Sequence, residues 1–178
     1  MQIADETPSD RADVRAVVRS AFGSDGDHVA GLLDALQASS AARPGLSLVA
    51  REHDRVVGHV LLTRSWLDAP ERLVEVLVLS PLSVAPAAQR RGVGTALVEH
   101  ARARADEQRW PLVFLEGDPR YYSARGFAPA GPLGFGSPSD RIPAEGFQVA
   151  ILRSYEPWMT GRLVYADAFW EQDAAGLR

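Results

Sequence analysis

The chain has 178 residues, and because a domain usually holds about 100–200 residues, we expect one domain over residues 1–178. All 19 basic residues are arginine, so lysine is absent, and cysteine is absent as well. The missing cysteine excludes disulfides, thiolate zinc sites, iron–sulfur clusters and a cysteine nucleophile. The missing lysine excludes Schiff-base enzymes and the Walker A loop, whose lysine reaches the phosphates of a nucleotide.

The formal net charge of −4 argues against a nucleic-acid partner, because such partners usually meet a basic face. The N-terminal residues lack the basic start and the apolar stretch of a signal peptide. The longest apolar runs are far shorter than the ~20 residues that cross a bilayer. We therefore expect a cytoplasmic protein that binds neither nucleic acid nor membrane. The oligomeric state stays open, with a homodimer as one alternative.

An edge strand and two helices are predicted near the N-terminus. Gln2 to Glu6 form the expected strand. Apolar residues then recur at helical spacing in two segments. The first follows Thr7-Pro8, a typical cap and first-turn proline, and ends at Gly23; the second runs from about Asp27 to just before Arg43.

The pattern then changes to that of strands. Residues 46–52 and 56–66 are rich in β-forming residues and flank a polar turn, which predicts a hairpin. A third strand is expected over residues 72–84 and contains Ser80-Pro81. Since proline cannot donate a hydrogen bond to a neighbouring strand, we expect a bulge, a diverging neighbour or a sheet edge at this point.

Helices and strands alternate in the rest of the chain. The longest helix is expected over residues 92–109, and the apolar run 112–116 is typical of a strand buried on both faces. Further predictions are a helix over 121–125, a strand from Phe127, a glycine- and proline-rich loop over 131–143, a strand over 147–152 and an aromatic tail packed on the domain. This order predicts an α/β fold with a mixed, mostly antiparallel central sheet and helices on both faces.

The strand–turn–helix segment over residues 82–97 carries the clearest chemical pattern. Its helix is expected to begin with Gly92 and Gly94, and the first N–H groups of a helix have no partner within it. Because these groups and the helix dipole favour an anion, we interpret the segment as a pyrophosphate site that needs no lysine. A purely structural turn is the alternative. A dinucleotide-binding fold is disfavoured, since Leu97 stands where its third glycine or alanine is expected.

Two motifs resemble those of one family. Residues 89–94, Gln-Arg-Arg-Gly-Val-Gly, match the Gln/Arg-x-x-Gly-x-Gly/Ala signature of the GNAT superfamily of acyl-CoA-dependent N-acyltransferases, and residues 82–86 precede them as the family's fourth strand does. Residues 121–127 resemble the second landmark, a tyrosine four residues before Gly-Phe. The resemblance extends from about Leu46 to Leu152, and residues 114–122 are similar to an uncharacterised bacterial branch.

The resemblance implies the GNAT fold and a site for acetyl-CoA. The strand ending at Val84 should diverge from the strand over 112–116 and leave a slot for pantetheine, which would bond backbone groups near Leu82 and Val84. An amide at the bulge would polarise the thioester carbonyl. Backbone amides are implied to hold the CoA pyrophosphate, with two side chains at the rim: the amides of Arg91, Gly92, Val93, Gly94 and Thr95, and the side chains of Gln89 and Arg90.

The resemblance also assigns Tyr122 as the general acid, whose phenol would protonate or hydrogen-bond the leaving thiolate, while Tyr121 is interpreted as a core aromatic residue. Glu116 is the first candidate for the general base, because a half-buried carboxylate at the end of its strand would have a raised pKa. A chain of water molecules is an alternative, and so are three other side chains: Glu75, His59 and Asp118. The spacing of the remaining histidines predicts no metal site.

The acceptor site carries no motif. We expect it to be built from the loop around residues 23–28, the loop over 131–143 and part of the aromatic tail. Asp25 and Asp27 are candidates for attracting a cationic amine, although a structural role as a helix cap is favoured for both. Three residues are candidates for an aromatic wall, although each also suits the core: Phe135, Trp66 and Trp158.

The resulting hypothesis is an N-acetyltransferase that moves an acetyl group from acetyl-CoA to a primary amine, with a small molecule as the expected acceptor. The absence of cysteine closes a route through an acetyl-cysteine, so direct transfer between the two bound substrates is expected. The alternatives are a non-catalytic module that senses acetyl-CoA, a different acyl donor, and an amine on a peptide or protein.

Overall fold

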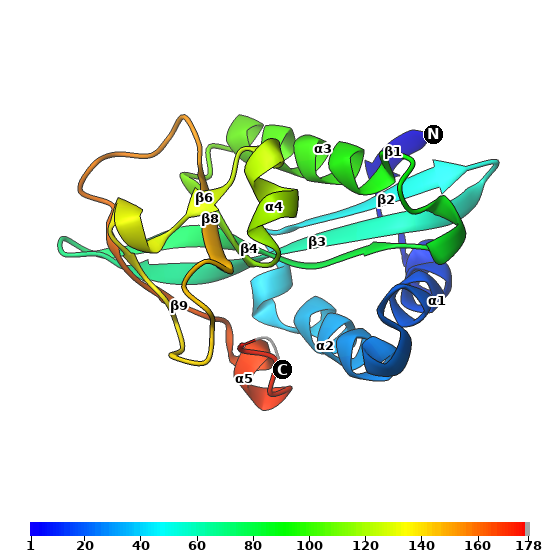
Figure 1. The fold of residues 1–178 in the computed structure, drawn as a ribbon, viewed down its shortest axis with the longest axis horizontal. Coiled ribbons are helices and arrows are strands. Elements are labelled where there is room, and N and C mark those ends of the chain that lie inside the picture. Colours follow the sequence, from blue (N-terminus) through cyan, green and yellow to red (C-terminus); the bar gives the residue numbers. More distant parts are fainter. Residues whose placement is uncertain (177–178) are drawn as a thin grey trace.

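Helices cover both faces of one open, mostly antiparallel sheet, as the sequence predicts (Figure 1). The computed structural model describes residues 1–176. The strands are β1 (Gln2–Asp5), β2 (Leu46–Glu52), β3 (Arg55–Asp68), β4 (Leu73–Val84), β5 (Leu112–Glu116), β6 (Ala128–Pro129), β7 (Phe135–Gly136), β8 (Phe147–Ile151) and β9 (Gly161–Val164). The helices are α1 (Arg11–Phe22), α2 (Gly26–Ala38), α3 (Val93–Glu107), α4 (Pro119–Tyr122) and α5 (Asp167–Glu171).

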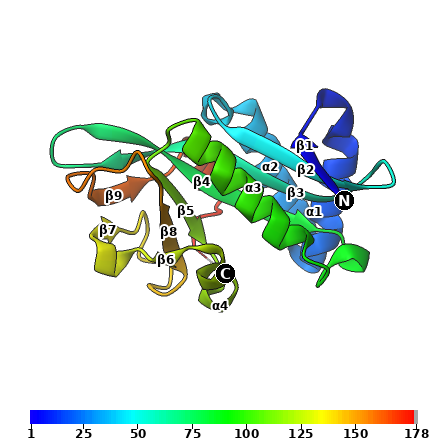
Figure 2. The same cartoon turned by 90° about the horizontal axis from the view of Figure 1, so that it is seen from above.

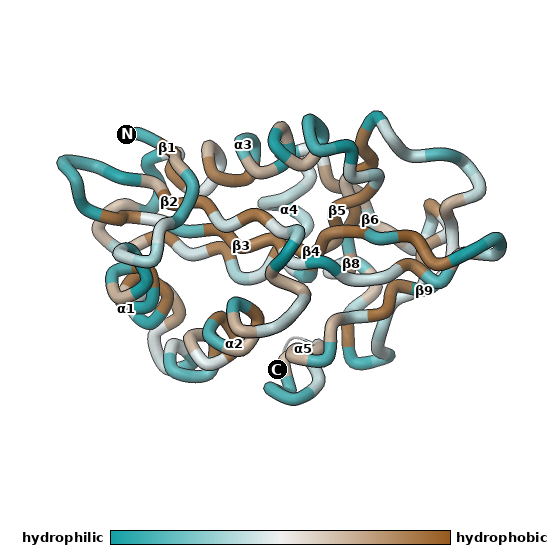
Figure 3. The backbone as a smooth tube through the Cα atoms, turned by 180° about the vertical axis from the view of Figure 1, so that it is seen from behind, coloured by the Kyte–Doolittle hydropathy of each residue, from teal (hydrophilic) through white to brown (hydrophobic). Residues whose placement is uncertain are grey.

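The main path of the sheet runs β1-β2-β3-β4-β5-β8-β6, and β9 pairs with the end of β3 and with β7. Alternate side chains of a strand face opposite sides, so each side of the sheet has its own core. Val60 and Leu62 of β3 pack on the side of α3, whereas Leu61 packs on the side of α1 and α2. Figure 3 shows the apolar residues concentrated along the strands and on the inner faces of the helices.

α3 illustrates how the sequence pattern produces this packing. Its buried residues recur at helical spacing and all face the sheet: Val93, Leu97, Val98, Ala101 and Ala105. Leu97 and Val93 come so close to β3 that a Cβ placed on Gly58 would lie 3.0 Å or less from both. α3 therefore packs across β2, β3 and β4, with its N-terminus beside the end of β4.

β4 contains the bulge that Ser80-Pro81 predicts. Leu62 of β3 pairs with Leu79, but Val60 pairs with Leu82, so β4 has one extra residue between these two pairs. A bulge of this kind bends the strand and frees it from its other neighbour. Beyond the bulge, β4 remains bonded to β3 as far as Val84.

β4 and β5 then diverge, as expected. Their parallel pairing is limited to Leu77 with Val113 and Val78 with Phe114. β5 continues toward α4 while β4 continues toward the start of α3, and Figure 2 shows the two strands separating. β5 is supported on its other side by β8 over all five of its residues. The diverging strands leave an opening in the middle of the sheet, next to the glycine-rich turn.

The C-terminal part of the chain forms more structure than its sequence predicts. β9 pairs with Trp66, Leu67 and Asp68 of β3. β3 itself ends at Asp68, two residues beyond its predicted end. α5 follows and packs against α2. The aromatic tail thus docks on the sheet and on α2, as expected. No helix within residues 1–176 is long and apolar enough to span a bilayer.

Candidate active site

The turn before α3 has the backbone expected of an anion site. Gly92 adopts a left-handed conformation with φ of +84°, which favours glycine, and a Cβ placed there would meet no heavy atom within 4 Å. The helical hydrogen bonds begin with the bond from Ala96 N–H to the Gly92 carbonyl. The N–H groups of Val93, Gly94 and Thr95 therefore precede the bonded part of the helix and point out of its N-terminal end.

Gly94 has a packing role that the sequence did not predict. A Cβ on Gly94 would lie 2.4 Å from the hydroxyl oxygen of Tyr121 and 3.5 Å from a methyl carbon of Val84. Gly94 therefore makes room for a tyrosine of α4 at the first turn of α3. Tyr121, which the sequence suggested as a core aromatic residue, instead reaches this turn and lines the cavity described below.

The polar side chains of the turn are held by neighbours. Arg91 donates two hydrogen bonds of 3.1 Å to the carboxylate of Glu52 at the end of β2. Gln89 donates to the Val84 carbonyl at 3.1 Å, so this carbonyl already has one partner before any ligand binds. Arg90 is exposed, with a left-handed φ of +58°. The three side chains surround the glycine turn with charge and hydrogen-bond donors.

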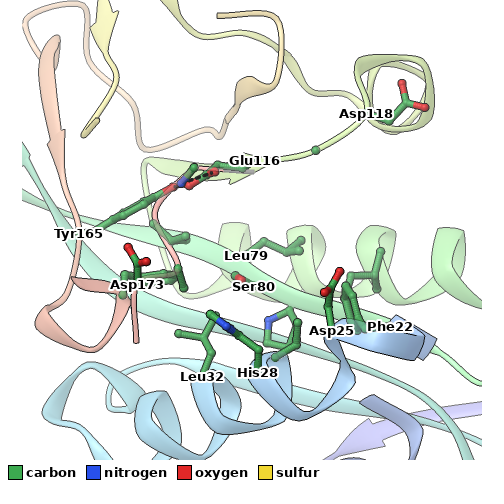
Figure 4. Close-up of a pocket in the computed structure, with 18 of the residues that line it drawn as sticks. Phe22, Asp25, His28, Leu32, Leu79, Ser80, Glu116, Asp118, Tyr165 and Asp173 are labelled. Atoms are coloured by element: carbon green, nitrogen blue, oxygen red, sulfur yellow. Dashed lines mark hydrogen bonds between the residues drawn. The ribbon is translucent and has the colours of Figure 1, made fainter. Parts of the chain in front are cut away.

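A cavity of about 880 Å³ opens between the diverging strands. Residues 78–82 of β4 and residues 116–118, which begin at the last residue of β5, form its walls, with Tyr121 and Tyr122 of α4. Residues of the α1–α2 junction and the C-terminal segment close its other side: Phe22, Asp25, His28, Val29, Leu32, Tyr165, Phe169, Asp173, Ala174 and Gly176. In Figure 4, Asp25 and His28 point toward the cavity from below and Glu116 from above.

Tyr122 lies where α4 meets the cavity. Its ring packs edge-on against Tyr121, with centroids 4.9 Å apart, and against Phe127, with centroids 5.7 Å apart. A Cβ on Gly117 would collide with the Tyr122 ring, so this glycine lets the ring lie across the end of β5. Burial raises the pKa of the Tyr122 phenol far above its usual value, with a smaller contribution from Tyr121 and an opposing effect of Arg125. The phenol therefore stays protonated at neutral pH.

Glu116, the last residue of β5, also lines the cavity. The Tyr165 hydroxyl donates to its Oε1, and the Gly176 N–H donates to its Oε2 at 3.1 Å. Burial raises the pKa of the Glu116 carboxyl, as expected, although these hydrogen bonds and the charge of Arg141 oppose the shift. Both donors come from the C-terminal segment, a contact that the sequence did not predict.

The three alternative bases differ in their access to the cavity. Among the described residues 1–176, Asp118 lines the cavity, whereas His59 and Glu75 do not. His59 is fully buried and contacts Ser47 at 2.9 Å and Glu6 at 3.3 Å. Glu75 pairs with Arg64 at 3.0 Å on the outside of the hairpin. Asp118 caps α4 and bonds Arg120, which lowers the pKa of its carboxyl.

The acceptor half agrees with the sequence in part. The α1–α2 junction and the tail line the cavity, but within residues 1–176 no part of the loop over 131–143 does. Asp25 lines it, whereas Asp27 is paired with Arg19. The three predicted wall aromatics lie elsewhere: Phe135 in the core against Phe114, Trp66 beside Arg64, and Trp158 beneath Arg72.

The aromatic wall is formed by Phe22, Tyr165 and Phe169 instead. Tyr165 and Phe169 stack with their centroids 4.5 Å apart. Phe22, the last residue of α1, is 37 % exposed and lines the cavity. No local signal in the sequence distinguishes these aromatics from those of the core. Within residues 1–176, no group of three or more histidine, aspartate or glutamate side chains is placed to hold a metal ion.

Known proteins match this chain over most of its length. The family model described as "Acetyltransferase (GNAT) family" matches residues 14–135. The uncharacterised N-acetyltransferase YjhQ of Escherichia coli K12 is 36 % identical over 169 residues, which cover 89 % of this chain and 88 % of that protein.

Two solved structures share the fold. The GNAT family N-acetyltransferase YhbS of Escherichia coli, solved in complex with CoA, matches with a TM-score of 0.83 and 25 % identity, covering 94 % of this chain and 91 % of that one. A GNAT family acetyltransferase of Brucella melitensis in complex with acetyl-CoA matches with a TM-score of 0.74 and 28 % identity, covering 94 % and 97 %. With the family match, these likenesses show that the chain belongs to the GNAT family of acetyltransferases.

Proposed function

We propose that the protein transfers an acetyl group from acetyl-CoA directly to a primary amine of a small, cationic molecule. The observation that carries this proposal is a single cavity that contains the divergence of β4 and β5, a protonated tyrosine and a carboxylate with a raised pKa. Relatives of the same fold bind CoA and acetyl-CoA, which supports the choice of donor.

The glycine turn suits the pyrophosphate of CoA. The open space over Gly92 and the outward N–H groups of Val93, Gly94 and Thr95 suit a bulky anion at the helix N-terminus. Arg90 and Arg91 add positive charge beside it. The free edge of β4 from Leu79 to Val84 offers backbone groups to pantetheine, as Leu82 and Val84 are implied to do.

Acetyl-CoA supplies the acetyl thioester. Glu116 takes a proton from the attacking amine, because only the neutral amine is a nucleophile and a raised pKa makes this carboxylate a stronger base. A new C–N bond forms as the C–S bond breaks. Tyr122 donates a hydrogen bond from its hydroxyl to the leaving sulfur, because its high pKa makes it a donor that stabilises the thiolate and not the source of the proton. The nitrogen loses a second proton as the amide forms, and that proton balances the one that the thiol finally gains. Glu116 passes the first proton to solvent.

The charges around the cavity favour a cationic acceptor. Four carboxylates line it from separate parts of the chain: Asp25, Glu116, Asp118 and Asp173. Asp118 is paired with Arg120, and Asp173 is paired with Arg141 at 2.9 Å, so the excess negative charge lies at Asp25 and Glu116. Phe22, Leu32 and Phe169 provide apolar contact for the carbon skeleton of the acceptor. A cavity of about 880 Å³ has room for a small molecule beside the acetyl end of the donor.

The test is a screen of amines with acetyl-CoA that follows both thiol release and the acetylated product. Small diamines, amino sugars, neutral amines and basic peptides form the panel. We expect thiol release with at least one small cationic amine and little with neutral amines of the same size. Binding of acetyl-CoA without turnover of any amine would contradict the proposal and favour the sensing module. Turnover restricted to peptides would reassign the acceptor.

A further inference from the structure

The roles proposed so far for the glycine turn and for the cavity do not explain the position of the Tyr121 side chain. It belongs to α4, yet its hydroxyl oxygen lies against Gly94 in the first turn of α3 and near a methyl group of Val84 at the end of β4. These three elements meet where the slot between the strands reaches the glycine turn. A tyrosine that served only the core would not need its hydroxyl at this junction.

The hydroxyl is held in place but has no partner among residues 1–176. Arg125 lies over the Tyr121 ring, with its guanidinium carbon 3.6 Å from the ring centroid, and also bonds the Tyr121 carbonyl. The Tyr122 ring packs edge-on with the Tyr121 ring, with the two centroids 4.9 Å apart. No hydrogen bond joins the Tyr121 hydroxyl to another described residue, so its donor remains available. Tyr121 also lines the cavity, which makes this donor accessible to a ligand.

Arg125 connects the same tyrosine to the anion site. It donates to the Thr95 hydroxyl oxygen through Nε at 3.1 Å and through Nη2 at 2.5 Å. Thr95 belongs to the turn whose N–H groups point out of the helix end. One guanidinium therefore fixes α4 on α3, orients the Tyr121 ring and adds positive charge beside the outward N–H groups.

We infer that the Tyr121 hydroxyl donates a hydrogen bond to the diphosphate of bound CoA. The inference rests on the proposed function, since it assumes that CoA occupies the slot and the turn. Tyr121 thus binds the donor at its diphosphate, whereas its neighbour Tyr122 acts at the sulfur. Arg125 is a positioning residue that holds the Tyr121 ring and Thr95 together.

The first test measures the Kd of CoA by calorimetry for the wild type and for Tyr121→Phe. The phenylalanine keeps the ring contacts with Arg125 and Tyr122, so we expect a melting temperature close to that of the wild type. A hydrogen bond to a charged group typically changes affinity by roughly tenfold or more, so we expect CoA to bind about 10-fold more weakly. Tyr155→Phe, which alters a ring packed on Phe135, is the matched control and should keep the Kd.

The second test locates the contact on the ligand by ³¹P NMR of bound CoA. In Tyr121→Phe we expect the diphosphate resonances to move while the 3′-phosphate resonance stays. Gly94→Ala should also weaken CoA binding, because its methyl group displaces the Tyr121 hydroxyl. The loss of CoA affinity caused by Gly94→Ala should be smaller in a protein that already carries Tyr121→Phe.

The outcomes separate the inference from the proposed function. If the wild type binds no CoA, the proposed function fails whatever Tyr121 does. If the wild type binds CoA but Tyr121→Phe keeps its Kd within about twofold, the assignment of Tyr121 is wrong. Diphosphate resonances that do not move would also overturn it, even if the affinity falls, because the loss would then reflect altered packing.

Discussion

The two halves of the proposed site are built in different ways. The donor half consists mainly of backbone from one continuous stretch, residues 82–95, which reaches the cavity at Leu82 and continues through the end of β4 and the turn into the start of α3. The acceptor half consists of side chains from three segments: residues 22–32, residues 116–118 and residues 165–176. A backbone site needs a particular local conformation, whereas a side-chain site needs a particular packing of distant segments.

This difference separates what is general in the site from what is specific. Backbone N–H groups at a helix N-terminus favour an anion whatever the neighbouring side chains are, so this half of the site depends little on the identity of its side chains. Charge and shape in the acceptor half depend on individual residues such as Asp25, Phe22 and Phe169. Variants of the donor half should therefore change donor affinity, those of the acceptor half should change amine selectivity, and those at the boundary should change the rate.

The largest expected effect is at the boundary between the halves. Tyr122→Phe removes the hydroxyl that we propose stabilises the leaving thiolate, but it keeps the packing against Tyr121 and Phe127. We expect kcat to fall by about 100-fold or more, as is usual when a general acid is lost, while the Kd of acetyl-CoA stays within about twofold. Steady-state kinetics and calorimetry measure the two quantities. An unchanged kcat would remove Tyr122 from the mechanism.

The next effect concerns the contact between Glu116 and the C-terminal segment. Glu116 must be deprotonated to act as a base, so kcat/KM should fall as the pH falls through its pKa. The Tyr165 hydroxyl stabilises the carboxylate and holds this pKa below the value that burial alone would produce. Tyr165→Phe should therefore move the acid limb of the pH profile to higher pH.

Glu116→Gln serves as the control for this pH dependence. It removes the titrating group, so we expect the acid limb to disappear and kcat to fall by about 100-fold. The measurement is the pH dependence of kcat/KM for the wild type, Tyr165→Phe and Glu116→Gln. If the acid limb persists in Glu116→Gln, another group is the base, and Asp118 or water becomes the first alternative.

A smaller effect is expected in the acceptor half. Asp25→Asn removes a carboxylate that lines the cavity and that faces solvent on the other side. Because exposed charge pairs contribute little, we expect the KM of a cationic amine to rise only about 3–10-fold, with an unchanged Kd for acetyl-CoA. Asp27→Asn is the matched control, since Asp27 pairs with Arg19, and it should leave both constants unchanged. Equal effects of the two substitutions would mean that Asp25 acts only through the overall charge.

The smallest effect is expected at the rim of the donor half. Arg91→Gln removes an exposed charge that already pairs with Glu52. We expect the Kd of acetyl-CoA to rise about 2–3-fold at low salt and less at high salt, because exposed charges are screened. Arg109→Gln, after the far end of α3, should have no effect on this Kd. A rise of more than about tenfold in the Kd of acetyl-CoA would show that Arg91 contacts the phosphates directly.

Much of the fold follows from local patterns. The positions that α3 buries are those at helical spacing in its sequence, and the run Leu112–Glu116 is a strand buried on both faces. Pro81 coincides with the bulge because proline removes one donor from the edge of β4. β9 and α5 were not predicted as elements, because both are short, and β9 is defined by its pairing with β3 and β7.

The candidate site divides in the same manner. The glycine turn and Tyr122 were predictable because their motifs are local. The role of Gly94 was not, since the hydroxyl that fills the space beside it belongs to Tyr121, which lies 27 positions later in the chain. Glu116 was predictable as the end of a strand, but its donors Tyr165 and Gly176 were not. The aromatic wall was not predictable for the same reason. Trp158 was expected to form it and Phe22 forms it instead, because the exposure of an aromatic side chain depends on packing.

The sequence by itself determined the turn geometry, the position of the proposed anion site and the order of strands and helices, because hydrogen bonding and periodicity act between residues close together in the chain. Only the tertiary structure decided which side chains line the acceptor half, how the C-terminal segment holds Glu116, and that Tyr121 reaches α3. These features depend on contacts between segments that are distant in sequence, and such contacts leave no pattern in any one of them.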